Sequence, residues 1–335
     1  MITSISHINP VLRISILAKI FHHSCTNSNL LVFAGFCRAF SLRRSVAIGY
    51  LHFIYSQSQQ TISKLKHPIV KRLLEVTGRI FFGICIAGIG VLHFLYPGIR
   101  PIIIPNLTNM ASGLSWVGYL VGLLLVSTGL LIITGKKYHT LSLIMGVVFL
   151  GLFLFVHLPP FLTAANQDGD PWIKLNKVLA LSGGFFLVST INAPGPGNSV
   201  LSFLYRLAPI GMYLFAMMLY NFSLAHIANI NGISSIVPKY IPFPKFWTVM
   251  GGIALMGSAI SIFTGYKTKT ITLLLAAVLF IWLLSLHLYY AFRYPEWKEG
   301  ENFVGVITCM AFCGIALIIS QRTTVNTLQQ YPEPA

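Results

Sequence analysis

Charged residues are scarce in this 335-residue sequence, and acidic residues are scarcest of all. Only 9% of the residues are charged, against about 25% in ordinary soluble proteins, and 23 lysines and arginines stand against seven acids. With 55% hydrophobic residues and a mean hydropathy of +0.76, the composition excludes a water-soluble fold. In a membrane protein the formal charge of +16 records the direction of insertion, and it gives no reason to expect nucleic acid as a partner.

Sequence signatures of metal, disulfide and hydrolytic chemistry are also missing. The five cysteines are odd in number and include no C-x-x-C, so neither a disulfide framework nor a dithiol pair is indicated. No H-E-x-x-H or similar ligand spacing occurs, and we predict no metal site. The loops between the apolar runs are too short for a soluble catalytic domain. Whether the protein is an enzyme stays open; if it is one, we expect a membrane oxidoreductase subunit.

Long apolar runs predict an all-α integral membrane protein with eight transmembrane helices. A bilayer core about 30 Å thick needs about 20 mostly apolar residues for each helix. The eight runs lie near 76–96, 114–134, 140–158, 175–192, 207–227, 246–265, 270–292 and 303–320.

The positions of the basic residues predict that both termini are cytoplasmic. Ten lysines and arginines precede position 80, and cytoplasmic loops are enriched in such residues. The later basic residues that mark alternate loops or the tail are Lys136, Lys137, Arg206, Lys267, Lys269 and Arg322. The acids that fall in loops assigned to the outside are Asp168, Asp170, Glu296, Glu299 and Glu301. We expect a bacterial-type inner (plasma) membrane in preference to an organellar one, with the lipid bilayer as the first partner.

Residues 1–68 form a basic extension that no apolar run of sufficient length crosses. Three interpretations stay open for it: a transit peptide, a basic arm on the membrane surface, or a non-functional extension upstream of the true start. The extension is expected to be disordered or absent from the mature fold. We therefore divide the chain into this extension, a four-helix unit at 69–194, a second unit at 195–322 and a tail at 323–335.

The two units are predicted to be copies of each other. Residues 116–157 align without a gap with 246–287 at an offset of 130, and a T-G-x-K turn recurs whole. Upstream, an offset of 133 pairs His93 with His226; downstream, an offset of 126 pairs Asn176 with Asn302. Four helices per copy give both copies the same orientation, so we expect a parallel repeat of two four-helix bundles.

Four histidines near the outer ends of predicted helices are the candidate site residues. His93 and His157 form one pair and His226 and His287 its counterpart in the second copy. An ionisable residue within a span is a functional hypothesis by default, and imidazole can bind a metal or haem iron, bond a quinone carbonyl or relay a proton. The alternative, which we favour on frequency, is that each histidine bonds the buried backbone near its helix end.

Two Pro-rich, apolar loops follow the first and fifth predicted helices, at 97–107 and 237–247. Backbone at membrane depth must be covered by protein, so these loops are predicted to lie across the outer end of each unit as lids. Their aromatic residues, Tyr240, Phe243, Phe246 and Trp247, fit an ordinary interfacial belt better than a binding site.

These features together resemble the DoxX-like family of small membrane proteins. The stretches that carry the resemblance are L-H-F-L-Y-P at 92–97, I-P-N-L, S-W-V-G-Y-L, I-T-G-K-K and F-V-H-L-P at 155–159. It covers roughly 70–320 as two tandem copies. The second copy departs from the pattern, since Tyr289 and Tyr290 stand where the first has Pro159 and Pro160, which makes the first copy the better candidate for a site.

The resemblance implies a redox-associated role in the membrane. It suggests a non-catalytic or accessory subunit that works with a quinone-linked system, with a quinone or haem near the four histidines and a membrane or peripheral oxidoreductase as partner. The alternatives are a small-solute transporter or channel and a membrane scaffold. The oligomeric state stays open.

Overall fold

A computed structural model describes residues 68–105, 115–163, 170–193 and 199–322 of the chain. The chain divides into two compact units, Met1–Ile69 and Val70–Ala335, and all that follows concerns the second. The predicted extension at 1–68, apart from its last residue, and the predicted tail at 323–335 lie outside the described residues, as does Asp168. Both predicted four-helix copies belong to the one unit Val70–Ala335, and the boundary between them stays a prediction.

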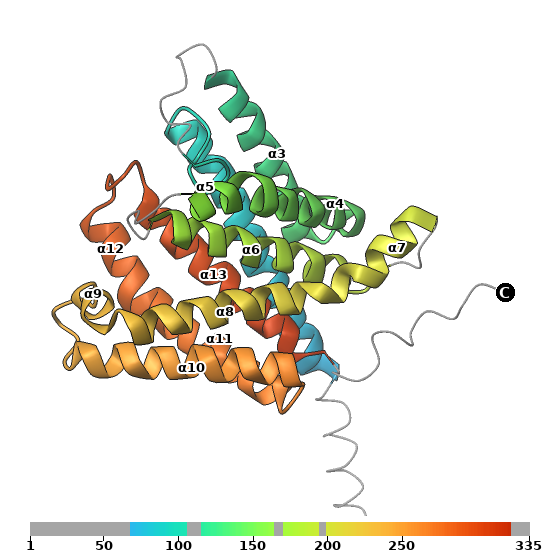
Figure 1. Ribbon diagram of the computed structural model, residues 1–335. Coiled ribbons are helices and arrows are strands. Elements are labelled where there is room, and N and C mark those ends of the chain that lie inside the picture. Colours follow the sequence, from blue (N-terminus) through green and yellow to red (C-terminus); the bar gives the residue numbers. More distant parts are fainter. Residues whose placement is uncertain (1–67, 106–114, 164–169, 194–198, 323–335) are drawn as a thin grey trace, which may run out of the picture. The chain divides into compact units, whose positions relative to one another are not determined.

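The described part of this unit is helical and contains no strand. A first helix runs over Pro68–Leu95 and is coloured blue in Figure 1. The elements after it are α3 (Ser115–Thr134), α4 (Tyr138–Gly151), η3 (Leu152–His157), α5 (Leu158–Thr163), α6 (Asp170–Ser189), α7 (Ser199–Leu207), η4 (Ala208–Ile210), α8 (Gly211–Ala228), α9 (Ile230–Ser235), α10 (Pro244–Thr264), α11 (Thr268–Trp282), η5 (Leu283–His287), α12 (Leu288–Arg293) and α13 (Glu301–Ser320).

Seven helical segments among the described residues are long and apolar enough to cross a membrane, as an all-α multi-pass membrane protein requires. Each overlaps one of the eight predicted runs. The remaining predicted run, the fourth in chain order at 175–192, coincides largely with α6. This helix has 20 residues but is not among the seven segments. Its first half carries Lys174 and Lys177, which lower its apolar character. An eighth span therefore stays a prediction.

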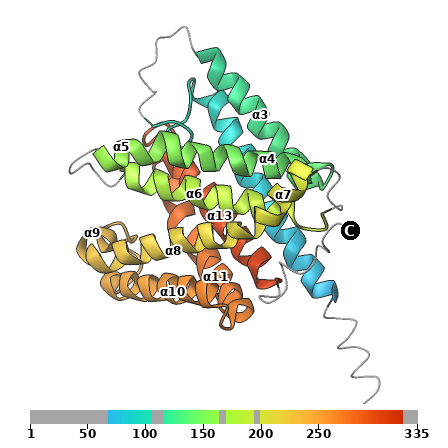
Figure 2. The ribbon, with the colours of Figure 1, turned by 45° about the vertical axis from the view of Figure 1, so that its right-hand side comes forward.

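We call residues 70–194 the first part of the unit and residues 195–322 the second part, after the two predicted copies. Helix pairs pack in the same way in both parts. α4 lies along α6, and α11 lies along α13; α8 packs against both α10 and α6. Figures 1 and 2 show the pairs α4–α6 and α8–α10 side by side from two directions. The core lies where the blue helix, α6, α8 and α13 meet, with Phe82 edge-on to Phe185 at 5.0 Å between ring centroids. α13 is the most enclosed of the seven segments, so it lies at the centre of the bundle.

Two glycine pairs bring these central helices into close contact. A Cβ atom at Gly78 would collide with the carbonyl oxygen of Gly314, and one at Gly183 would collide with that of Gly211. The converse collisions hold for Gly314 and Gly211. The blue helix therefore approaches α13, and α6 approaches α8, as closely as backbones allow. Small residues serve this purpose in membrane helices because apolar burial alone gives little drive for association in lipid.

The two T-G-x-K turns have the same geometry. Gly135 and Gly265 both have φ of 74°, and Lys137 and Lys267 lie in the left-handed region at 49° and 46°. The helices that follow both end in a π-helical segment that closes on a histidine, η3 at His157 and η5 at His287. π-helical segments of this kind are rare and often occur at functional sites.

The contacts of the last helix of each part differ from the expected offset of 126. The Ser182 hydroxyl donates to the Gly146 carbonyl at 2.8 Å, and the Cys313 thiol donates to the Ala276 carbonyl at 2.9 Å. Gly146 and Ala276 are 130 positions apart, while Ser182 and Cys313 are 131 apart. α6 and α13 also start and end 131 positions apart. The predicted offset of 126 rested on pairing Asn176 with Asn302. The structure gives these two asparagines different hydrogen-bond partners, so the pairing was wrong.

Candidate functional site

The loop after the blue helix folds inward over the first part, at the end where this helix finishes. Ile102 is fully buried and Ile103 is 6% exposed. The backbone N–H groups of Ile103 and Ile104 both donate to the carbonyl of Arg100, at 2.8 and 3.2 Å, which closes a tight turn. The described part of this loop therefore forms the lid that the sequence predicts.

The loop before α10 has exposed aromatic side chains, unlike the buried loop after the blue helix. Tyr240, Phe243, Phe246 and Trp247 are 50–75% exposed, so they do not form a buried lid, and the interfacial aromatic belt stays a prediction. The Tyr240 hydroxyl donates to the carbonyl of Ser285 in η5, and this bond holds the loop against the second part.

Both ring nitrogens of His93 are hydrogen-bonded to backbone groups. Its side chain is completely buried, Nδ1 donates to the carbonyl of Ile89 at 2.8 Å, and Nε2 accepts from the backbone N–H of Arg100 at 3.2 Å. Neither ring nitrogen is left for a ligand. His93 therefore fixes the lid to the end of its own helix, which is the structural alternative considered for all four histidines.

His157 holds the other side of the same turn. It ends η3, its side chain is 3% exposed, and Nε2 donates to the carbonyl of Ile103 at 3.0 Å. The structure thus brings His93 and His157 to one four-residue turn. Their shared partner is lid backbone, and this pair explains how an apolar, Pro-rich loop is held at membrane depth.

The second pair of histidines is more open. His226 donates from Nδ1 to the carbonyl of Phe222 at 2.7 Å, as His93 does to Ile89, but its ring is partly exposed. Nε2 has no hydrogen-bond partner in the part of the chain that the structure describes. The ring stacks on Trp282 at 6.2 Å between centroids, with planes 10° apart.

His287 ends η5 and lies deep in the unit, yet it remains partly exposed. The residue is therefore mostly enclosed by the bundle, and only part of it reaches the surface. No hydrogen bond joins its ring to any described residue. Its Nδ1 faces Gly305 of α13, where an added Cβ would lie 3.1 Å away.

Residues of both parts surround His287. Lys177 of α6 lies close enough for its charge to act on His287, on Cys85 of the blue helix and on Cys309 of α13. All three described cysteines are free and buried, and the Cys309 thiol donates to the carbonyl of Leu279 at 3.4 Å. One ammonium group, that of Lys177, therefore acts electrostatically on His287 within the bundle.

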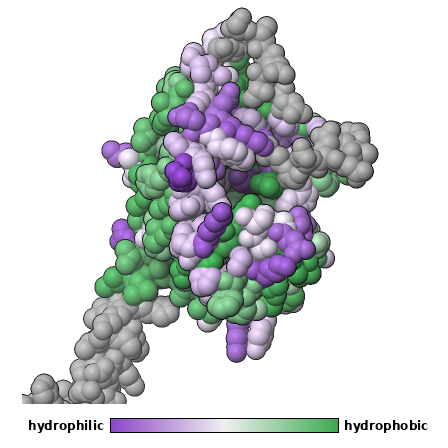
Figure 3. Space-filling model, turned by 90° about the vertical axis from the view of Figure 1, so that its left-hand side faces the viewer, coloured by the Kyte–Doolittle hydropathy of each residue, from purple (hydrophilic) through white to green (hydrophobic). Residues whose placement is uncertain are grey.

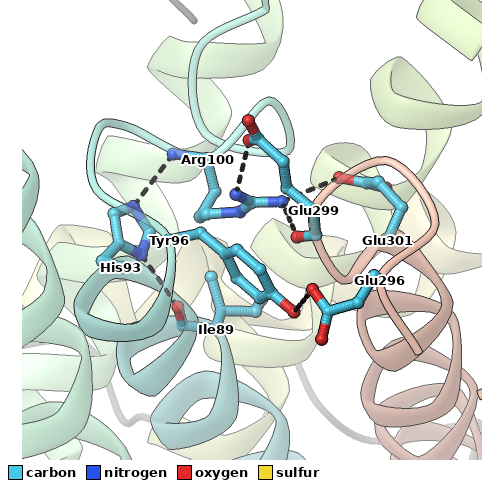
Figure 4. A network of polar contacts seen from close by, with 7 residues as sticks. All are labelled: Ile89, His93, Tyr96, Arg100, Glu296, Glu299 and Glu301. Atoms are coloured by element: carbon cyan, nitrogen blue, oxygen red, sulfur yellow. Dashed lines mark hydrogen bonds and ion pairs between the residues drawn. The ribbon is translucent and has the colours of Figure 1, made fainter.

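An ionic network joins the loop after the blue helix to the loop before α13, as Figure 4 shows. Arg100, whose side chain is 2% exposed, reaches from the lid to the loop before α13. It donates to the Glu299 carbonyl oxygen at 2.6 Å, pairs with the Glu299 carboxylate at 3.3 Å and lies 3.9 Å from the Glu301 carboxylate. Its guanidinium also lies 5.2 Å from the centroid of the Tyr96 ring.

Tyr96 completes this network from the exposed side. Its hydroxyl donates to the Glu296 carboxylate at 3.0 Å. Loss of hydration, followed by this bond and the charge of Glu296, raises the pKa of the Tyr96 phenol. Figure 3 shows this end of the molecule, with hydrophilic side chains gathered over its middle and hydrophobic ones at its flanks.

Arg100 is a site residue that the sequence does not single out, unlike the four histidines. Arg100 was visible only as one residue of a Pro-rich loop, and its partners lie about 200 positions away in the sequence. The one available signal was the cluster of acids in the loop that contains Glu299 and Glu301, opposite a lone arginine at the same predicted depth. Within the described ranges, no group of three or more histidine, cysteine or acidic side chains could hold a metal ion.

Comparisons with known proteins add no relative to this description, since no family model, curated protein or solved structure matches the chain.

Proposed function

We propose that the chain is a multi-pass membrane protein of DoxX-like type, an accessory subunit that serves a quinone-linked redox system. In this proposal it consists of two tandem four-helix copies over roughly 70–320, inserted with both termini on the cytoplasmic side of a bacterial-type plasma membrane. The matched turns, the matched π-helical segments and the paired glycine contacts support the duplication.

The choice of site depends on one observation. The first pair of histidines hydrogen-bonds the lid backbone, whereas the second pair does not. Nε2 of His93 and Nε2 of His157 bond the backbone of a buried turn, and Nδ1 of His93 bonds the carbonyl of Ile89. His226 and His287 are partly exposed, and His287 bonds no described residue. The functional site therefore belongs beside the second pair, although the sequence had favoured the first.

The surroundings of the second pair suit the headgroup of a quinone. An imidazole N–H can donate to a quinone carbonyl, and Trp282, stacked on His226, offers an aromatic wall. The helices that carry His226 and His287 are long and apolar enough to lie in a bilayer, which favours a ligand that dissolves in it. A haem would be held by the same two imidazoles, and the test below distinguishes a haem from a quinone.

A small-solute path between the two copies is the second candidate. Lys177 supports it, because the charge of this α6 side chain acts on residues of the other copy, and ionisable residues within spans commonly mark substrate paths. A scaffold role remains the simplest alternative.

The proposal can be tested on protein purified in mild detergent with its native lipids. The absorption spectrum, metal content and extracted quinone are measured for the wild type, for His287→Gln and for the matched control His93→Gln. We expect bound quinone in the wild type, its loss in His287→Gln, and its retention in whatever fraction of His93→Gln folds. Capture of an oxidoreductase with the wild type would support the accessory role. Absence of quinone, haem and partner together would refute the proposal, and uptake of solute by vesicles would favour the path instead.

A further inference from the structure

The two parts of the unit meet at two helix–helix interfaces built in the same way. α6 of the first part packs against α8 of the second, and the blue helix of the first part packs against α13 of the second. α6 and α13 are counterparts 131 positions apart, and the blue helix and α8 are predicted counterparts. Each interface therefore joins the last helix of one copy to the first helix of the other.

Glycines mark the closest point of both interfaces. In the α6–α8 interface, a Cβ atom at Gly183 would collide with the carbonyl oxygen of Gly211. In the other interface, a Cβ atom at Gly314 would collide with that of Gly78. The two last-helix glycines are 131 positions apart and the two first-helix glycines are 133 apart. These are the offsets of the helices themselves, so one contact is made twice.

The side chains beside these glycines repeat as well. Leu214 and Phe81 lie next to the last-helix glycines, and they are 133 positions apart. Phe186 and Leu317 lie next to the first-helix glycines, and they are 131 apart. The match therefore extends from the glycines to the apolar residues packed around them.

A third contact further along the same helices also occurs twice, with different side chains. In the α6–α8 interface, Nδ2 of Asn221 donates to Oδ1 of Asn176 at 2.7 Å. The equivalent positions in the other interface are Gly88 and Ile307. A Cβ atom at Gly88 would lie 3.2 Å from the Ile307 side chain, so a small residue there faces a large one.

One contact joins two residues that are counterparts of each other. Gly184 and Ile315 are 131 positions apart, and a Cβ atom at Gly184 would lie 2.8 Å from Cδ1 of Ile315. In a twofold-symmetric interface each contact occurs twice with the partners exchanged. A residue meets its own counterpart only on the axis. The contacts therefore fit a twofold axis that passes between α6 and α13.

We infer that the first and last helices of each copy form a self-complementary association surface, whose partner is a second four-helix unit of the same kind. In this chain the other copy occupies that surface, so the protein is a dimer joined in one chain. A twofold interface is closed, and a redox partner must bind the remaining faces. The inference rests on the duplication in the proposed function, but it does not depend on a quinone.

The test cleaves the folded, full-length protein between its two copies. A protease site is placed in the Pro- and Gly-rich stretch 194–198, and an affinity tag is added at the C-terminus. After cleavage in mild detergent, the recovery of the first piece with the tagged second piece is measured as SDS is added. We expect the two pieces of the wild type to stay together without SDS.

The glycine contacts are tested with one variant in each interface. Gly183→Val and Gly314→Val should each raise the dissociation constant of the pieces by about tenfold, equivalent to about 1.4 kcal/mol. Their effects should be similar, because the two contacts are equivalent. Gly257→Val is the control, since a Cβ atom at Gly257 meets nothing within 4 Å, and it should leave the dissociation constant unchanged.

A pair of double variants tests the twofold relation itself, and it decides the matter if the glycine variants fail to fold. Asn176→Ile with Asn221→Gly copies the pair found in the other interface, whereas Asn176→Gly with Asn221→Ile places the same side chains in the opposite order. We expect the copied pair to hold the pieces together about tenfold more tightly than the reversed pair.

Three results would overturn the inference: wild-type pieces that separate on cleavage, release by only one of the two glycine variants, or a reversed pair that binds as tightly as the copied one. No quinone is added, so quinone binding can fail while this result holds, and the reverse.

Discussion

The ion pairs of Arg100 differ enough in burial to predict which one stabilises the fold. Arg100 is 2% exposed, Glu301 is 8% exposed and Glu299 is 61% exposed. An exposed ion pair contributes about 0–1 kcal/mol, whereas removal of one member of a buried pair costs about 3–5 kcal/mol because the other charge is left alone. The 3.9 Å separation from Glu301 favours the lower end of that range.

We therefore expect Arg100→Met to lower the free energy of unfolding by about 3 kcal/mol. Most of that loss should vanish when Glu301→Gln accompanies it, since no charge is then stranded. The coupling with Glu299 should stay below about 1 kcal/mol. The assay is a double-mutant cycle on unfolding in mixed micelles of dodecyl maltoside and SDS, followed by tryptophan fluorescence. A cost of Arg100→Met below about 1 kcal/mol, or a coupling that is larger with Glu299 than with Glu301, would refute the reasoning.

Three further predictions test the packing, the turns and the electrostatics. Gly183→Ala should cost about 1–3 kcal/mol in the same unfolding assay because its Cβ meets a backbone carbonyl, whereas Gly257→Ala, with no atom within 4 Å, should be neutral; equal effects would contradict the close approach of the helices. Lys137→Gly should stabilise the fold by about 0.5 kcal/mol, since φ is 49° there; a loss would argue against the left-handed turn. Glu296→Gln should move the titration of Tyr96 to lower pH, because part of its raised pKa comes from that carboxylate; alkaline ultraviolet difference spectra would show no movement if the bond were absent.

Much of the fold could be predicted from the sequence because bilayer thickness imposes a length on apolar runs. Seven of the eight predicted runs coincide with segments able to span a membrane. The T-G-x-K turns were also visible, since glycine and a following left-handed residue commonly end a helix. Helix ends were less predictable: residues 68–75 are already helical, although the predicted apolar run begins at 76, because this stretch carries charged residues that lower its hydropathy.

The candidate site was only half predictable. Four histidines at matching positions look equivalent in the sequence, but their roles depend on which backbone the neighbouring loop presents. The lid gives His93 the N–H of Arg100 and gives His157 the carbonyl of Ile103. In the second part the corresponding loop forms α9 and leaves His287 without such a partner. No spacing rule encodes that difference, because it arises from long-range packing.

The central claim, that a quinone headgroup binds beside His287, is tested most directly by photolabelling. The purified wild-type protein is illuminated with an azido-substituted quinone, with and without an excess of unmodified quinone, and the labelled peptides are identified by mass spectrometry. The account predicts label that the excess displaces, within Leu283–Arg293 or the outer half of α13. It predicts none on the lid at 97–105. Label on the lid, or label spread over lipid-facing α3 and insensitive to competition, would contradict it.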